Sequence, residues 1–209
     1  NGLLCAGADL SASRLLDAYQ RGIFPWYSTG EPILWWSPHP RFVLFPEELH
    51  VSRTLKSLLG KKTFTITFDR AFPFVIEACG RPVPGRENTW ITPDVREAYL
   101  TLHEMGYAHS VEAWQDERIA GGLYGVSLGR CFFGESMFTE VSNASKAAFV
   151  TLVDRLAALS FTMIDCQVFT RHLQGLGARM ISRQAFMNRL HAALTHPTLR
   201  GNWSENAAF

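Results

Sequence analysis

The sequence predicts a mixed α/β fold whose sheet is mostly antiparallel, and three observations support this. Residues 109–138 read as a β-meander of three strands, in which the turn Gly129-Arg130 joins the last two strands as a hairpin. Residues 143–159 place apolar side chains at helical spacing on one broad face. This helix stands between strands predicted over residues 131–138 and 161–169. The right-handed crossover of such a β-α-β unit sets the two strands side by side.

The remaining elements follow from signals at their ends. Asp9 is a candidate cap for a first helix that ends at Gly22. Thr92 is expected to cap another helix, with Pro93 at its first position and Gly106 as its end. Further helices are expected over residues 52–59, 71–79 and 183–194 and near Arg171, and further strands over residues 41–45 and 64–68.

Length and composition define the class of protein. A chain of 209 residues with 47% hydrophobic and 19% charged residues fits a globular enzyme of one large domain, or of one domain with a small appendage. The formal net charge of +1 is no signature of nucleic-acid binding, so such a role requires a local patch. The four cysteines form no C-x-x-C pair, and we expect them to be reduced, as in a cytoplasmic protein. The seven histidines lack metal-ligand spacing, and no signal peptide or apolar run of membrane-spanning length is evident. We therefore expect no metal, no other cofactor and no membrane partner.

Residues 134–146 are the most informative part of the chain. An apolar strand leads directly into Glu135, and a helix is expected to begin near Ser142 or Asn143. A carboxylate among aromatic neighbours is costly unless a partner compensates its charge, which favours a functional site. The alternative is a structural carboxylate that faces solvent or accepts hydrogen bonds from local backbone donors.

The strand predicted over residues 161–169 adds two polar side chains. Side chains alternate between the faces of a strand, so Asp165 and Gln167 point the same way at a spacing of roughly 7 Å. A bulge at Gly134 would aim Glu135 at the gap between the two strands. The three side chains are then a candidate catalytic centre. The alternative is that Asp165 and Gln167 are a buried hydrogen-bonded pair that only fixes the sheet.

A basic stretch and a group of tryptophans are candidates for contact with nucleic acid. Residues 50–63 contain no acidic residue, and their cations form either a phosphate-contact patch or a solvated helix face: Arg53, Lys56, Lys61 and Lys62. The tryptophans between residues 26 and 36 stand beside prolines and glycines. Such rings either cover the protein surface or stack against a base.

Taken together, these segments resemble the leucyl/phenylalanyl-tRNA–protein transferase family. The matching segments extend over nearly the whole chain and include LLDAYQRGIFPW at residues 15–26, ILWWSP at 33–38, GESMF at 134–138, NASK at 143–146 and IDCQV at 164–168. The resemblance implies a GNAT-like acyltransferase domain over residues 41–209, preceded by a small N-terminal domain with Trp-rich loops over residues 1–40. It also implies transfer of Leu, Phe or, less often, Met from aminoacyl-tRNA to proteins that begin with Arg or Lys. Such transfer marks those proteins for degradation in the N-degron pathway.

The same resemblance assigns roles to individual residues. Trp26 and Trp90 would embrace the terminal adenosine of the tRNA. Gln167, oriented by Asp165, would handle protons, and Glu135 would face the reacting groups. The pocket for the aminoacyl side chain would consist of Leu123, Phe132, Met137, Phe149, Leu152, Leu156 and Ile164. We expect the protein to act as a monomer.

Two other classes of protein remain compatible with the sequence. One is an acyl-CoA-dependent N-acyltransferase on the same fold, which would need a glycine-rich pyrophosphate loop before a helix. Residues 173–179 contain two glycines but follow a helical stretch, so they match this requirement weakly. The other is a non-catalytic binder of tRNA or of degron peptides, which would bind both substrates without turnover.

Overall fold

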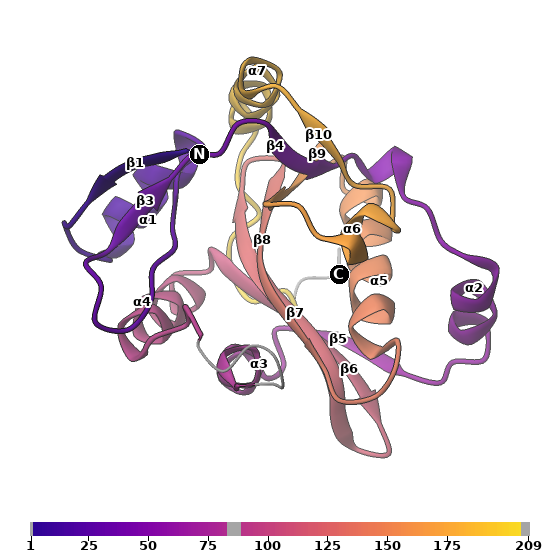
Figure 1. Cartoon of the computed structure of the whole chain (residues 1–209). Coiled ribbons are helices and arrows are strands. Elements are labelled where there is room, and N and C mark those ends of the chain that lie inside the picture. The colour runs from indigo at the N-terminus through magenta and orange to yellow at the C-terminus, as the bar shows by residue number, and fades with distance from the viewer. Residues whose placement is uncertain (1, 83–88, 206–209) are drawn as a thin grey trace.

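The computed structural model describes residues 2–82 and 89–205, and in this part of the chain eighteen helices and strands form two sheets with surrounding helices (Figure 1). The smaller sheet has three antiparallel strands in the order β1 (Leu3–Ala6), β3 (Leu34–Trp36) and β2 (Phe24–Pro25). The larger sheet has seven strands in the order β10 (Arg179–Ile181), β4 (Arg41–Leu44), β9 (Met163–Gln167), β8 (Cys131–Thr139), β7 (Arg118–Leu128), β6 (Ala108–Gln115) and β5 (Thr65–Phe68).

Every pair of neighbouring strands in the larger sheet is antiparallel except β8 and β9. These two strands are joined by α5 (Ala144–Ala158), which is the predicted β-α-β unit. The expected mixed α/β fold with a mostly antiparallel sheet is therefore confirmed. The hairpin between β7 and β8 is also present, with Leu128 paired to Cys131 across the two-residue turn.

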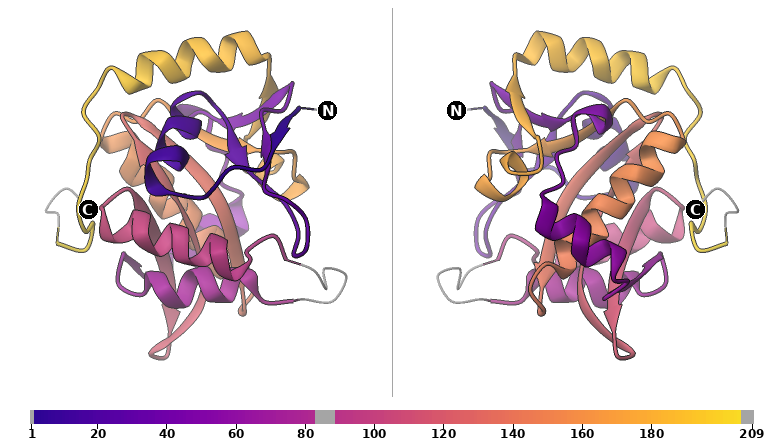
Figure 2. Two further views of the ribbon diagram at one scale, coloured as in Figure 1. Left: turned by 90° about the vertical axis from the view of Figure 1, so that its left-hand side faces the viewer. Right: turned by 90° about the vertical axis from the view of Figure 1, so that its right-hand side faces the viewer.

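The larger sheet separates two hydrophobic cores. The core on one face contains buried side chains of α1 (Ala12–Gln20), α3 (Phe72–Gly80), α4 (Pro93–Glu104) and α7 (Arg183–Leu194). The core on the other face contains α5 and one side chain of α2 (Arg53–Gly60). Figure 1 shows α5 and α2 on one side of the sheet and α3 and α4 on the other, and Figure 2 shows the same layers from both sides. The chain also has a 3-10 helix, η1 (Pro46–Glu48), and a short helix, α6 (Arg171–Gln174).

Two local predictions are corrected by the structure. The first helix begins at Ala12 with Ser11 as its N-cap residue, and Asp9 instead accepts a hydrogen bond from the backbone N–H of Ser11. An acidic side chain that accepts a hydrogen bond from the backbone N–H two residues later forms a turn before the helix and does not cap it. The strand predicted over residues 161–169 is shorter, because Gln167 adopts a left-handed backbone with φ of 62° and ends β9.

The division of the chain near residue 40 stays a prediction. The first 36 residues contain a sheet of their own. Yet buried side chains of α1, among them Leu15 and Tyr19, belong to the same core as α4 and α7. The N-terminal segment thereby contributes side chains directly to the main body of the protein.

Candidate active site

The site lies where the two parallel strands part. β8 and β9 pair only at three positions, the last of them between Phe133 and Asp165. Just beyond, Tyr124 of β7 pairs with Ser136 and Gly125 pairs with Gly134, so Glu135 has no counterpart on β7. A residue without a counterpart is a bulge, which bends its strand and re-aims a side chain. The predicted bulge at this position is confirmed.

A cavity of about 740 Å³ opens at this point. Its walls come from β2, β7, β8, β9 and the first two turns of α5, and from Trp90 and the segment around α6. Glu135 and Gln167 lie in the wall where the strands separate. The volume is in the range of sites that bind small molecules or cofactors.

Most of the predicted aminoacyl pocket lines this cavity: Leu123, Phe132, Met137, Phe149 and Ile164. Gly125 allows this packing, because a Cβ atom there would lie 2.6 Å from the ring of Phe132.

Leu152 and Leu156 differ from this prediction, because both are fully buried in the core and do not line the cavity. Only the first turns of α5 reach the cavity. With a rise of 1.5 Å per residue, Leu152 lies about 4.5 Å and Leu156 about 10 Å further along the helix axis than Phe149.

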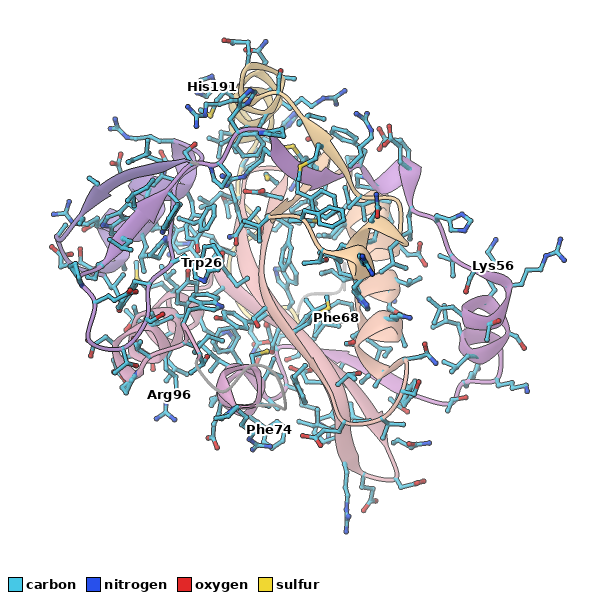
Figure 3. All side chains as sticks on the ribbon, viewed as in Figure 1. Trp26, Lys56, Phe68, Phe74, Arg96 and His191 are labelled. Atoms are coloured by element: carbon cyan, nitrogen blue, oxygen red, sulfur yellow. The ribbon has the colours of Figure 1, made fainter. Side chains whose placement is uncertain are left out.

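Trp26 and Trp90 also line the cavity. Trp26 is 44% exposed, and its ring lies against that of Trp36 with centroids 5.9 Å apart. The indole N–H of Trp36 donates to the backbone carbonyl of Trp26 at 2.7 Å and holds this segment in place. Figure 3 shows Trp26 on the side of the molecule away from Lys56.

The carboxylate of Glu135 lies at the centre of a hydrogen-bond network drawn from four elements. The amide N–H of Gln167 donates to its Oε1 at 2.8 Å, so the predicted contact between Glu135 and Gln167 is confirmed. The hydroxyl of Tyr19 from α1 donates to Oε1 at 2.6 Å, and that of Tyr99 from α4 donates to Oε2 at 3.1 Å. The two tyrosine hydroxyls also contact each other.

This environment changes the acid–base behaviour of Glu135. Burial raises the pKa of its carboxyl group to about 7, although the hydrogen bonds from Tyr19, Tyr99 and Gln167 favour the ionised form. Burial also raises the pKa of Tyr19 and of Tyr99 well above the ordinary value, so both remain phenols. A carboxyl group with this pKa is partly protonated near pH 7, which suits a group that exchanges protons.

Asp165 lies behind the site rather than in the cavity wall. Its two carboxylate oxygens accept hydrogen bonds from the guanidinium of Arg41 at 2.8 and 2.6 Å, and both residues are buried. The backbone N–H of Gln167 donates to Oδ1 of Asp165 at 2.9 Å. Asp165 thus positions the main chain of Gln167, and it does not line the cavity as Glu135 and Gln167 do.

The sequence reasoning missed three of these functional side chains. Tyr19 and Tyr99 lie within the helices predicted to end at Gly22 and to begin after Thr92, and Arg41 lies at the start of the strand predicted over residues 41–45, but none of the three was singled out. The guanidinium of Arg41 is held between the rings of Phe24 and Phe186, at 4.8 and 4.6 Å from their centroids. The sequence does contain a signal for such residues, because a tyrosine or arginine on a buried face of a helix or strand needs a partner for its polar end.

The four cations of the predicted basic patch are all exposed: Arg53, Lys56, Lys61 and Lys62. Arg53 is the first residue of α2, and Lys61 and Lys62 follow its last residue. Within residues 2–82 and 89–205, no carboxylate lies within ion-pair distance of any of them. They remain available to an external anion.

Residues 43–191 match the family described as leucyl/phenylalanyl-tRNA protein transferase, and residues 8–39 match the N-terminal domain of the same family. This chain belongs to that family. The enzyme of that name from Syntrophus aciditrophicus is 60% identical over 207 residues, which cover 98% of this chain and 86% of that protein. The one from Desulfatibacillum aliphaticivorans is 58% identical over 98% of this chain and 88% of its own length.

The solved structures found to be similar to this chain resemble its fold only loosely. A functionally unknown conserved protein from Staphylococcus epidermidis has a TM-score of 0.45 at 10% identity, covering 86% of this chain and 68% of that chain. The L-PGS structure from Bacillus licheniformis has a TM-score of 0.44 at 10% identity, covering 93% and 66%. Neither likeness is close enough to support an argument about the site.

The described part of the chain contains neither a membrane-spanning helix nor a metal cluster. Across residues 2–82 and 89–205, no helix has the length and apolar character needed to cross a membrane. The same ranges contain no group of three or more His, Cys, Asp or Glu side chains arranged to hold a metal ion.

Proposed function

We propose that this protein transfers Leu, Phe or, less often, Met from aminoacyl-tRNA to proteins whose first residue is Arg or Lys. It would act in the cytoplasm as a monomer without a cofactor, and its products would enter the N-degron pathway. The observation that supports this most directly is the contact between Glu135 and Gln167 at the wall of a largely apolar cavity. Membership of the transferase family supports the same conclusion.

The chemistry needs positioning more than activation. The aminoacyl ester is already reactive, and the α-amino group of the acceptor has an ordinary pKa of about 7.7–8.0, so part of it is neutral near pH 7. Glu135 binds the incoming ammonium group and takes one proton from it, and Gln167 donates a hydrogen bond that positions the carboxylate of Glu135. The neutral amine then attacks the ester carbonyl and a C–N bond forms. The C–O bond to the terminal ribose breaks, and the second proton that the nitrogen loses passes to the ribose oxygen, which leaves as a hydroxyl group.

The cavity selects the amino acid by shape and polarity. Its apolar floor fits a side chain that is unbranched at Cβ, and charged side chains are rejected by the cost of removing them from water. Discrimination between apolar side chains is modest, on the order of 1–3 kcal/mol per methylene. Val and Ile are disfavoured because their branched Cβ would lie beside the ester.

Trp26 and Trp90 would hold the terminal adenosine by stacking, and the basic patch on α2 would contact phosphates of the acceptor stem. The proposed arrangement places the nucleotide on one side of Glu135 and the amino acid on the apolar floor. The ester between them then lies beside Glu135 and Gln167.

The decisive experiment incubates labelled Phe-tRNA with a peptide that begins with Arg and measures labelling of the peptide. A peptide that begins with Glu is the control and is expected to stay unlabelled. Gln167→Ala and Glu135→Gln should lower turnover while aminoacyl-tRNA affinity stays nearly unchanged, because both residues act on the attacking amine. Binding of both substrates by the wild-type protein without labelling would indicate a non-catalytic binder. Acetyl transfer from acetyl-coenzyme A to the same peptide would indicate an acyl-CoA-dependent acyltransferase.

A further inference from the structure

One wall of the cavity is polar and takes no part in the chemistry described above. Ser145 and Lys146, in the first turn of α5, and His172 of α6 all line the cavity. In the view of Figures 1 and 3, Trp26 and α5 lie on opposite sides of β8. Figure 1 shows α5 and α6 on the side of the sheet that carries α2.

Each of these three side chains has a polar group without a hydrogen-bond or ion-pair partner among the described residues. Ser145 is only 5% exposed, and its hydroxyl makes no hydrogen bond to any residue in the part of the chain that the structure describes. Lys146 is half-buried, and no described carboxylate lies within 4.0 Å of its ammonium group. The Nε2 atom of His172 is buried and has no hydrogen-bond partner among the described residues.

The electrostatics of this wall favour an anion. Burial and then the charge of Lys146 lower the pKa of His172, so the positive charge of Lys146 already acts on its neighbour. Asn143, the N-cap residue of α5, makes no side-chain hydrogen bond to the helix. The backbone N–H groups of Ala144 and Ser145 donate to the carbonyl of Val141 and the hydroxyl of Thr139, so in this first turn only the N–H of Lys146 has no partner among the described residues. The positive end of the α5 dipole adds to the attraction for a negative group. A buried polar side chain without a partner is costly unless a ligand supplies one.

We propose that Ser145, Lys146 and His172 bind the phosphodiester that joins the terminal adenosine of the tRNA to the nucleotide before it. The inference rests on the proposed function and adds a contact to it. α2 packs against α5, so this wall stands between the basic patch and the tryptophans on the far side of the cavity. A single-stranded 3′ end that runs from α2 to Trp26 has to pass over α5 and α6, and its last phosphate meets this wall.

The test compares two small ligands that differ in this phosphate. One is phenylalanyl-adenosine, which has no phosphate, and the other is the dinucleotide cytidylyl-adenosine with phenylalanine on its 3′ end. Lys146→Met is expected to weaken dinucleotide binding by about 10-fold or more and to leave binding of phenylalanyl-adenosine unchanged. The slope of log affinity against log salt for the dinucleotide should fall by about 0.7, the value for one phosphate contact on a single strand. Ser145→Ala should lower affinity for the dinucleotide in the same selective way.

Arg155→Met is the matched control, because Arg155 is an exposed cation of the same helix that does not line the cavity. Unfolding midpoints of all variants exclude a general loss of fold. Equal weakening of both ligands in Lys146→Met would overturn the inference, since the lysine would then act on the aminoacyl group. Unchanged binding of both ligands would overturn it as well.

Failure of the inference is distinguishable from failure of the proposed function. If the wild-type protein labels the Arg peptide but Lys146→Met shows no phosphate-specific effect, only the phosphate site is wrong. If the wild-type protein binds coenzyme A more tightly than the dinucleotide, and Lys146→Met removes that preference, the wall serves a pyrophosphate and both proposals are overturned.

Discussion

Glu135 is the residue whose chemical state the structure defines most sharply. Its carboxylate accepts hydrogen bonds from the hydroxyls of Tyr19 and Tyr99 and from the amide of Gln167. Burial outweighs these hydrogen bonds and raises the pKa of the carboxyl group to about 7. Binding of an ammonium group beside Glu135 would favour the ionised form again.

The first prediction concerns the pH dependence of turnover. For wild type, kcat/KM toward the acceptor peptide should rise with pH through about 7, because Glu135 must lose its proton before it can accept one. The Glu135→Gln variant should retain only the ionisation of the acceptor amine, near pH 7.7–8.0. An unaltered profile in Glu135→Gln would assign the ionisation near 7 to another group.

The same group makes folding stability depend on pH. Its carboxyl pKa is raised from the ordinary value of 4.5 to about 7 in the folded protein. Between these two pH values the folded state therefore keeps a proton that the unfolded state has released. The free energy of unfolding therefore falls as pH rises through this window. Denaturant titrations at several pH values should show a smaller fall for Glu135→Gln.

A second residue-scale prediction concerns Trp26 and Trp90. Stacking on a base is worth about 1–3 kcal/mol, so Trp26→Ala or Trp90→Ala should weaken binding of phenylalanyl-adenosine by roughly 5- to 150-fold. Trp114→Ala is the control, since Trp114 lies on β6 and does not line the cavity. Lower stability with unchanged affinity in the folded fraction would make Trp26 and Trp90 packing residues.

At the scale of elements, one part of the inner face of α5 lines the cavity and the other part packs in the core. Phe149 and Leu152 are both buried, and only Phe149 lines the cavity. Phe149→Ala should change the ratio of Phe transfer to Leu transfer, because it enlarges the space that receives the side chain. Leu152→Ala should lower stability by about 2–5 kcal/mol and leave that ratio unchanged. Competition between Phe-tRNA and Leu-tRNA measures the ratio. An unchanged ratio in Phe149→Ala would contradict the pocket assignment.

The prediction for α2 concerns tRNA affinity. Replacing Arg53, Lys56, Lys61 and Lys62 together by Ala should weaken binding of all cognate tRNAs alike, because phosphate contacts contain no base information. The dependence of log affinity on log salt should also become shallower, by about 0.9 for each duplex phosphate that the protein no longer neutralises. Filter binding at several salt concentrations measures both effects. Wild-type affinity at every concentration would reduce the patch to a solvated helix face.

At the scale of the whole molecule, the site depends on contacts between segments far apart in the sequence. Arg41 and Asp165 are 124 positions apart and form a buried ion pair with two hydrogen bonds. The pair anchors β4 to β9 directly behind Gln167. Removing one partner of such a pair leaves the other charge buried without compensation.

The last prediction follows from this pair. Asp165→Asn should lower the free energy of unfolding by about 3–5 kcal/mol, because the guanidinium of Arg41 loses its anion. Turnover should fall as well, since β9 no longer holds Gln167 firmly. The double variant Arg41→Met with Asp165→Leu should recover most of the stability and little of the turnover. Full stability in Asp165→Asn with abolished turnover would give Asp165 a direct part in the chemistry.

Local signals in the sequence predicted much of the fold. The β-meander, the helix between two parallel strands and the cap at Thr92 depend on side chains within a few residues of each other. The bulge that presents Glu135 was also predicted, because Gly134 stands just before it. The face of α5 that lines the cavity was predicted only in part. Hydrophobic periodicity shows which side of a helix faces inward, but it does not show where along the helix the core ends and the cavity begins.

The sequence by itself determined the helices and strands, the family and most of the residues that meet at the cavity, since short-range backbone preferences and contiguous motifs encode all of these. Tertiary structure alone decided that Tyr19 and Tyr99 bond to Glu135 and that Asp165 faces Arg41. It also decided that Ser145, Lys146 and His172 share a wall of the cavity. The physical reason is that the pairing of a buried polar group depends on which distant side chain arrives beside it. That depends on how the sheet and its two cores pack, which spacing along the chain does not contain.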